Sequence, residues 1–299
     1  MNKVYFFFFF ITSGFVLASS DYVDSKSRIL GQLNQNQSIL DEMVRDLNGL
    51  DQSVKNLFVS PATKLTLPKD DLFLEFSKPF KNLVNGETEN AYSSLLIKYT
   101  GNCVISFAGM LTQQSIELFI DTAKKVIQYP CSNTLVRLNS IGGQTAAGIY
   151  LGFAIKVNGW DTIAWNKDIN LKDNPFNACN SSCVLAFVGG KNRYILPLDK
   201  LKLTKNEYGF VGIHRGFEKV GNKLVCQSNV SDINNLLSYQ YLKNISPDMA
   251  ILYISKIIST DCGVFNYLTE SPSDVVLNKY IYTAIYDEQV INRYAFVKK

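Results

Sequence analysis

The stretch Thr134–Gly143, TLVRLNSIGG, carries the pattern that decides the fold. Its first five residues are the mixture of β-branched and apolar side chains typical of a strand. The glycine pair Gly142 and Gly143 follows, and residues 144–157 then form a small-residue-rich segment of helical character. Paired glycines between a strand and a helix can leave backbone N–H groups free to stabilise an oxyanion. An ordinary turn has the same pattern, so both interpretations stay open.

Strands and helices alternate on both sides of this stretch. Strands are expected at residues 94–99, 103–107, 162–165 and 280–286, a helix at 112–128, and two helices within 230–258, split at Ser246-Pro247. This alternation predicts βαβ crossovers, and therefore an α/β fold with a largely parallel sheet. We expect this domain to span residues 93–299.

The N-terminal part of the chain is organised differently. Residues 1–20 have a basic start, an apolar core and small residues at the end, which predicts a secretory signal peptide; an uncleaved membrane anchor is the alternative. Residues 26–58 predict a helix, either a coiled coil through which copies of the chain assemble or an amphipathic helix lying on the following domain. Residues 59–92 are expected to be a linker because prolines punctuate them. The heptad positions of the helix are Ile29, Leu33, Leu40, Met43, Leu47, Leu50, Val54 and Leu57.

Composition excludes some functions and permits others. The net charge of the 299 residues is only +4 and forms no basic stripe, so nucleic acid is not an expected partner. The cysteines lack the spacing of zinc ligands, and no ATP-binding motif is present, so neither a metal nor a cofactor is expected. An even number of cysteines in an exported chain permits disulfides. The pairs considered are Cys179–Cys183, Cys103–Cys131 and Cys226–Cys262, and the alternative is that Cys179 and Cys183 are free and buried.

Two further segments carry candidate chemistry. Residues 178–190, ACNSSCVLAFVGG, begin a helix with Ser181 and Ser182 in its first turn, at the positive end of the helix dipole. A serine in that position is ordinarily an N-cap. The chain has a single histidine, His214, in the segment Gly212–Arg215. If a serine acts as a nucleophile, His214 is the only histidine that could be its base.

In this order the segments resemble the Clp-protease proteolytic subunit and its relatives in the crotonase-like superfamily. Residues 138–143 correspond to the family's strand followed by Ser-Pro-Gly-Gly, Ser181 falls at the nucleophile with Gly189-Gly190 downstream, and Ile213-His214 corresponds to the catalytic histidine. The resemblance is strongest to an exported branch with a Cys-x-Ser-x-Cys motif, here Cys179–Cys183. It covers about residues 94–286 and implies a crotonase-like fold of repeated ββα units.

The resemblance also implies the roles of the site residues. Ser181 would be the nucleophile and His214 the base, and backbone N–H groups of Gly142, Gly143 and Ser182 would form the oxyanion hole. The family's third triad member precedes a Leu-Ser/Thr pair by seven residues. Leu268-Thr269 here points to Asp261, with Asp274 as the second choice.

The sequence departs from the family pattern in three places. Ile141 stands where the family has a proline, and an asparagine-rich stretch at residues 166–177 lengthens the approach to Ser181. His214 also follows Ser181 at a greater distance along the chain than in the family. The first departure weakens the prediction of an oxyanion turn, although both glycines are kept.

These features together predict an exported serine hydrolase, periplasmic or secreted, that acts on peptides or unfolded proteins and forms a homo-oligomer. Contact with a membrane is expected only if the signal segment stays uncleaved, which would leave the protein anchored and facing the periplasm. One alternative is a non-catalytic envelope protein that assembles through its N-terminal helix and keeps a relic of the site. A crotonase-like acyl-CoA enzyme is a further alternative, which export disfavours because CoA is intracellular.

Overall fold

The computed structural model describes residues 26–59, 61, 63–83, 85–164, 178–195, 210–220, 223–226, 229, 231–260, 266–267, 281–282 and 284–285. The predicted signal peptide at residues 1–20 lies outside this range, and so do Asp261, Cys262 and Asp274. Within the described range, no helix is both long and apolar enough to cross a membrane.

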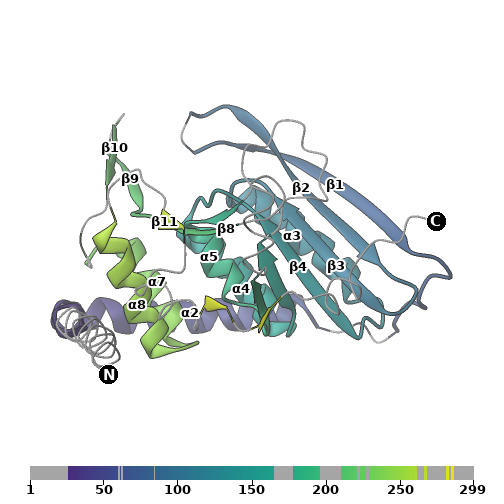
Figure 1. The fold of residues 1–299 in the computed structure, drawn as a ribbon, viewed down its shortest axis with the longest axis horizontal. Coiled ribbons are helices and arrows are strands. Elements are labelled where there is room, and N and C mark those ends of the chain that lie inside the picture. The colour runs from purple at the N-terminus through teal and green to yellow at the C-terminus, as the bar shows by residue number, and fades with distance from the viewer. Residues whose placement is uncertain are drawn as a thin grey trace, which may run out of the picture.

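The largest sheet is mixed and has seven strands, in the order β1-β2-β3-β4-β5-β7-β12, and Figure 1 shows β1 to β4 at the side of the molecule opposite α7 and α8. Neighbouring strands are antiparallel from β1 to β3 and parallel from β3 to β12. The predicted α/β fold with a largely parallel sheet is therefore confirmed. The strands are β1 (Leu72–Lys81), β2 (Thr88–Ile97), β3 (Asn102–Ala108), β4 (Asn133–Asn139), β5 (Asp161–Ala164), β7 (Arg193–Ile195) and β12 (Ala284–Ile285).

Strand β1 corrects the prediction that residues 59–92 are only a linker. Its ten residues pair in continuous antiparallel register with β2, from Leu72 opposite Ile97 to Lys81 opposite Thr88. Two features hide the strand in the sequence. Phe73 places an apolar side chain on the exposed face, which blurs the alternation, and Pro79 is normally a strand breaker. Proline is tolerated here because β1 is an edge strand.

Helix α3 (Gln113–Val126) packs on β1, β2 and β3, and a capping box of Thr112 and Ser115 fixes its start. Helix α4 (Thr145–Val157) crosses α5 (Ser182–Phe187) at very short range. A β-carbon built on Gly148 would lie 2.2 Å from the carbonyl oxygen of Ser182, so only glycine fits there. Glycine at position 148 is thus what allows α5 to lie this close to α4.

The N-terminal helical segment lies on its own domain. Residues 26–34 are helical, and α2 (Gln37–Leu57) follows after a turn. Helix α2 contacts α4 and α7 (Ile233–Lys243), and Leu40, Met43, Leu47 and Val54 are buried within the single chain. These contacts agree with the amphipathic-helix alternative, and self-association through residues 26–58 stays a prediction. The expected break at Ser246-Pro247 is confirmed, because Ser246 caps α8 (Pro247–Ser259).

A second, three-stranded sheet has the order β11-β8-β6. Strand β6 (Ala178–Asn180) is parallel to β8 (Phe210–Ile213), and β11 (Asn266–Tyr267) is antiparallel to β8. The chain then forms a hairpin of β9 (Phe217–Val220) and β10 (Lys223–Cys226), which stands away from β1 and β2 in Figure 1. The three-stranded sheet carries the strands that precede Ser181 and His214, which are β6 and β8.

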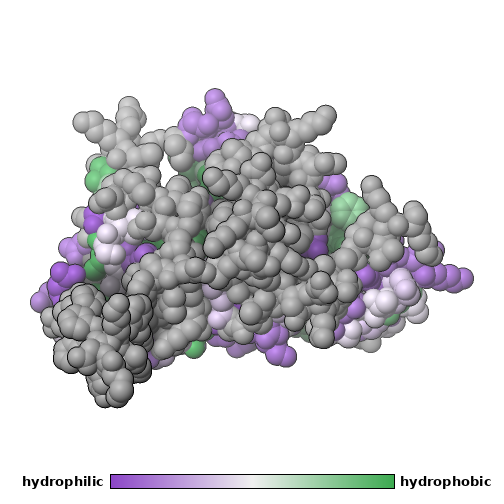
Figure 2. Space-filling view, in the orientation of Figure 1, coloured by the Kyte–Doolittle hydropathy of each residue, from purple (hydrophilic) through white to green (hydrophobic). Residues whose placement is uncertain are grey.

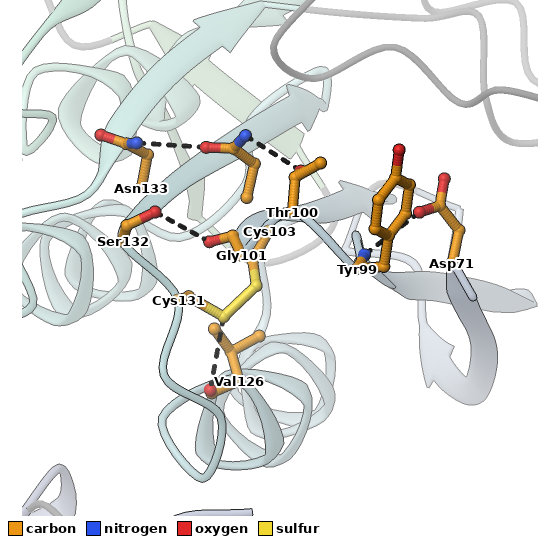
Figure 3. Close-up of a disulfide and its surroundings, with 10 residues drawn as sticks. Asp71, Tyr99, Thr100, Gly101, Cys103, Val126, Cys131, Ser132 and Asn133 are labelled. Atoms are coloured by element: carbon orange, nitrogen blue, oxygen red, sulfur yellow. Dashed lines mark hydrogen bonds between the residues drawn. A yellow bond between two sulfur atoms is a disulfide. The ribbon is translucent and has the colours of Figure 1, made fainter. Parts of the chain in front are cut away.

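Two of the predicted disulfides are present, Cys103–Cys131 and Cys179–Cys183. The first joins the beginning of β3 to the segment before β4, next to a hydrogen bond from the Ser132 hydroxyl to the Gly101 carbonyl at 3.1 Å (Figure 3). It therefore closes the β3–α3–β4 crossover at the amino ends of its strands. Cys226 is also disulfide-bonded, whereas Cys262 of the third predicted pair lies outside the described residues.

The exposed large hydrophobic side chains are scattered. Val59, Ile233 and Tyr99 are the most exposed of them, and they come from different parts of the chain. On the face drawn in Figure 2, the described hydrophobic residues form separate small areas and no continuous apolar surface.

Candidate active site

The glycine pair after β4 forms a tight turn that the segment after β3 holds in place. Gly142 and Gly143 have φ values of 100° and 141°, which favour glycine. Leu111 N–H donates to the Gly142 carbonyl at 2.7 Å, and Gln144 N–H donates to the Leu111 carbonyl at 2.8 Å. A β-carbon on Gly143 would lie 2.2 Å from the Leu111 carbonyl oxygen. Leu111 therefore forms hydrogen bonds with the residues before and after Gly143, and position 143 has no room for a side chain.

The three predicted oxyanion donors are not equivalent. Gly142 N–H already donates to the Ser140 hydroxyl at 3.1 Å, so it is engaged inside the turn. Gly143 N–H has no acceptor among the described residues. Ser182 is the first residue of α5, where a helix leaves its N–H groups without intrahelical acceptors. Gly143 and Ser182 are thus the donors that remain available, and Ser140, which the sequence analysis did not single out, supports the turn.

Ser181 occupies a strained position between β6 and α5. With φ 56° and ψ −125°, it is the only non-glycine residue in the described part of the chain with a positive φ. Such a backbone costs on the order of 1–3 kcal/mol and is concentrated at functional sites. Ser181 N–H donates to the Gly212 carbonyl at 2.8 Å, and the Ser181 carbonyl accepts from Val184 N–H at 3.0 Å. These bonds hold a sharp strand-to-helix turn with Ser181 at its tip.

The side chain of Ser181 does not cap the helix that it precedes. Ser181 occupies the N-cap position of α5, as the alternative interpretation expects, but its side chain makes no capping hydrogen bond there. Ser181 is half-buried, whereas the neighbouring Ser182 is only 4% exposed. A serine at the tip of a strained strand-to-helix turn is the geometry of an accessible nucleophile. Ser181 is therefore the better candidate of the two serines.

The glycine turn and Ser181 are in direct contact. A β-carbon built on Gly142 would lie 2.5 Å from the β-carbon of Ser181 and 3.0 Å from its hydroxyl oxygen. Asn180 N–H donates to the Ser140 carbonyl at 2.8 Å, which aligns the two segments. The structure thus joins two motifs that the sequence presented separately.

His214 leaves the strand next to the one that leads to Ser181. Asn180 of β6 is paired in parallel with Gly212 of β8, and His214 directly follows the last residue of β8. Adjacent strands lie about 4.8 Å apart, so Ser181 and His214 emerge from the same end of two neighbouring strands. The side chain of His214 is half-buried, and burial lowers its pKa, partly offset by a backbone hydrogen bond at Arg215. A lowered pKa keeps the imidazole neutral near pH 7, as a general base requires.

Arg215 ties the His214 segment to α8. Its guanidinium donates to the carbonyl of Ile258 near the C-terminal end of that helix, where the helix dipole favours a cation. On the other side, Asn266 of β11 is paired with Ile213. Asp261, the predicted third triad member, and Asp274, the second choice, fall outside the described residues.

Three buried polar side chains belong to the segments that meet at the site. The side-chain oxygens of Asn139, Asn180 and Ser182 are buried and have no hydrogen-bond partner among the described residues. Among those residues, no group of His, Cys, Asp and Glu side chains is arranged to hold a metal ion. The described residues of the site include a serine hydroxyl, an imidazole and backbone N–H groups.

No protein-family model matches the chain, and no curated protein matches it.

Proposed function

We propose that this protein is an exported serine hydrolase that cleaves peptide bonds. Ser181 is the nucleophile, His214 is the general base, and Asp261 is the third member of the triad. The observation that carries the proposal is the strained backbone of Ser181 in contact with the Gly142-Gly143 turn. A structural serine would have no reason to adopt this conformation beside two glycines, whereas a nucleophile beside an oxyanion hole would.

The proposed reaction proceeds through an acyl-enzyme. The hydroxyl oxygen of Ser181 attacks the carbonyl carbon of the substrate while His214 accepts the hydroxyl proton. The N–H groups of Gly143 and Ser182 stabilise the negative charge that develops on the carbonyl oxygen. His214 then donates its proton to the leaving amine. Water then attacks the ester carbonyl while His214 accepts a proton from it. His214 returns this proton to the oxygen of Ser181, and the acid is released.

The Clp-protease-like, crotonase-type fold is part of the proposal. The order strand, glycine pair, helix, nucleophile, histidine strand is the order that the resemblance requires, and the mixed sheet with its small second sheet is compatible with it. Export is supported by the two complete disulfides, which are typical of oxidising compartments. Unfolded chains or short peptides are the proposed substrates, because the chain carries no ATP-binding motif for unfolding a folded one.

Hydrolysis of an unstructured protein such as casein, together with that of a small activated ester, tests this proposal. The wild-type protein should cleave both substrates, and the Ser181→Ala and His214→Ala variants should lose at least about 10³-fold in kcat/KM. Ser182→Ala is the matched control, because alanine keeps the backbone N–H at this position. A folded wild type that cleaves neither substrate, with the same unfolding temperature as Ser181→Ala, would instead favour the relic envelope protein. Cleavage of the ester alone would keep the hydrolase and reject the peptide substrate.

A further inference from the structure

The disulfide Cys179–Cys183 encloses Ser181. Cys179 belongs to β6 and Cys183 to α5, two residues on either side of the serine, and both sulfur-bearing side chains are fully buried. The bridge therefore spans the strand-to-helix turn that gives Ser181 its conformation.

The bridge requires the chain to reverse within four residues. The Cα atoms of Cys179 and Cys183 are 5.1 Å apart. Four residues of extended chain would span about 13 Å, and four helical residues rise about 6 Å. A separation this short in a segment that begins as a strand needs a sharp turn between the two cysteines. The positive φ of 56° at Ser181 supplies that turn.

The ends of the turn are fixed against the rest of the site. Cys179 forms an isolated parallel bridge with Ser140, which precedes the glycine turn. At the other end, the carbonyl of Ser182 lies against Gly148 of α4. A covalent link between two such anchored points limits the positions open to Ser181. A serine with a positive φ is unfavourable by itself, and this backbone conformation persists only where the surrounding structure holds it.

We propose that the Cys179–Cys183 disulfide is a positioning element that holds Ser181 against the Gly142-Gly143 turn, so that hydrolytic activity requires this bridge. The inference rests on the proposed function. It implies that the enzyme gains activity only after a disulfide oxidant accepts two electrons and two protons from the thiols of Cys179 and Cys183 and is itself converted to a dithiol. A dithiol would reverse this by supplying two electrons and two protons, which convert the disulfide to two thiols while the dithiol becomes a disulfide.

The second bridge provides a matched control. Cys103–Cys131 lies at the amino ends of β3 and β4, whereas Ser181 touches the turn that follows the carboxyl end of β4. It closes a longer loop, with a sequence separation of 28 against 4. Removal of Cys103–Cys131, which closes the longer loop, should therefore lower the stability more. Removal of Cys179–Cys183 should mainly affect the position of Ser181.

The test compares the double variants Cys179→Ala/Cys183→Ala and Cys103→Ala/Cys131→Ala with the wild type. The unfolding temperature of each protein is measured first. The rate of fluorophosphonate labelling, and kcat and KM for a small ester, are then measured well below the lowest of these temperatures. The first variant should lose about 10- to 100-fold in labelling rate and kcat with KM nearly unchanged, as expected for a misplaced reacting group. The second variant should unfold at a lower temperature and keep its labelling rate.

The outcomes separate the two proposals. Equal labelling of both variants and the wild type would overturn the positioning role and leave the hydrolase intact. Absence of labelling in all three, the wild type included, would reject the hydrolase and the positioning role with it. If Cys179→Ala/Cys183→Ala does not fold, the folded wild type is reduced stepwise with dithiothreitol and each bridge is followed by peptide mapping. Labelling should then fall with the 179–183 bridge and return on reoxidation, and labelling of molecules with both thiols alkylated would overturn the proposal.

Discussion

Gly142 lies against Ser181 so closely that a β-carbon at position 142 would come within 2.5 Å of the Ser181 β-carbon. Gly142→Ala should therefore push Ser181 out of place and also force alanine into a φ of 100°. We expect the variant to lose fluorophosphonate labelling and more than about 2 kcal/mol of stability, measured by denaturant unfolding.

Gly159 is the control for the backbone part of this effect. It also has a positive φ, 63°, but a β-carbon there would meet nothing within 4 Å. Gly159→Ala should cost about 1 kcal/mol and keep the labelling rate of the wild type. Normal labelling of Gly142→Ala would show that the contact with Ser181 is irrelevant to the site.

The buried position of His214 predicts the pH dependence of the reaction. Since burial lowers the pKa of this imidazole below its usual 6.5, the neutral form should already dominate at pH 7. Labelling of Ser181 should rise with pH along a curve whose midpoint lies below 6.5 and should be flat at higher pH. Because His214 is the only histidine in the chain, its imidazole signals can be followed by NMR in the same pH range without ambiguity.

The lowered pKa of His214 should also make the stability of the fold depend on pH. Below pH 6.5 the unfolded chain binds a proton at His214 more readily than the folded one does, so the fold should lose stability as pH falls through 6.5 to the lower pKa of the folded state. The His214→Gln variant should lack this part of the pH dependence. A labelling midpoint at or above 6.5 would contradict the role of a buried neutral base.

Arg215 should support His214 through α8. Removal of the guanidinium in Arg215→Ala breaks the hydrogen bond to the Ile258 carbonyl and should cost about 1–2 kcal/mol in unfolding free energy. The labelling rate should fall as well, because the strand end that carries His214 loses its attachment. Arg45→Ala, on the exposed side of α2, is the control and should leave both quantities unchanged. Equal behaviour of the two variants would mean that Arg215 has no part in positioning the histidine.

The apolar face of α2 should stabilise the fold of a single chain through its contacts with α4 and α7. Leu47 is 2% exposed, whereas Ile39 on the same helix is 41% exposed. Leu47→Ala should therefore cost about 2–4 kcal/mol and Ile39→Ala much less, measured by denaturant unfolding. Light scattering on the same variants tests the predicted oligomer. A change of mass without a change of unfolding in Leu47→Ala would favour the coiled coil over packing on α4 and α7.

The sequence predicted those parts of the fold whose signals are local. The strand, the glycine pair and the small-residue helix from Thr134 to Val157 were predicted because the pattern is continuous in the chain. The Cys179–Cys183 and Cys103–Cys131 pairs were among the predicted disulfides. Strand β1 was missed because apolar residues on both faces and Pro79 obscured its period.

The arrangement of the site depends on pairings between distant segments. Strands β6 and β8 have only three and four residues, too few for a period to be recognised, and the register of Asn180 with Gly212 is not written in either segment. The clamp by Leu111 and the hydrogen bond from Gly142 to Ser140 likewise arise only when the crossovers bring these residues together. The predicted donor Gly142 proved to be engaged for this reason.

Mass-spectrometric mapping of the fluorophosphonate adduct tests the central claim most directly. The wild type and the Ser182→Ala variant should each carry one adduct on the peptide that contains residue 181, and fragmentation should place it on Ser181. The Ser181→Ala variant should carry no adduct, although its unfolding temperature equals that of the wild type. An adduct on Ser182, equal labelling of Ser181→Ala and wild type, or no adduct on the wild type would contradict the assignment of Ser181 as the nucleophile.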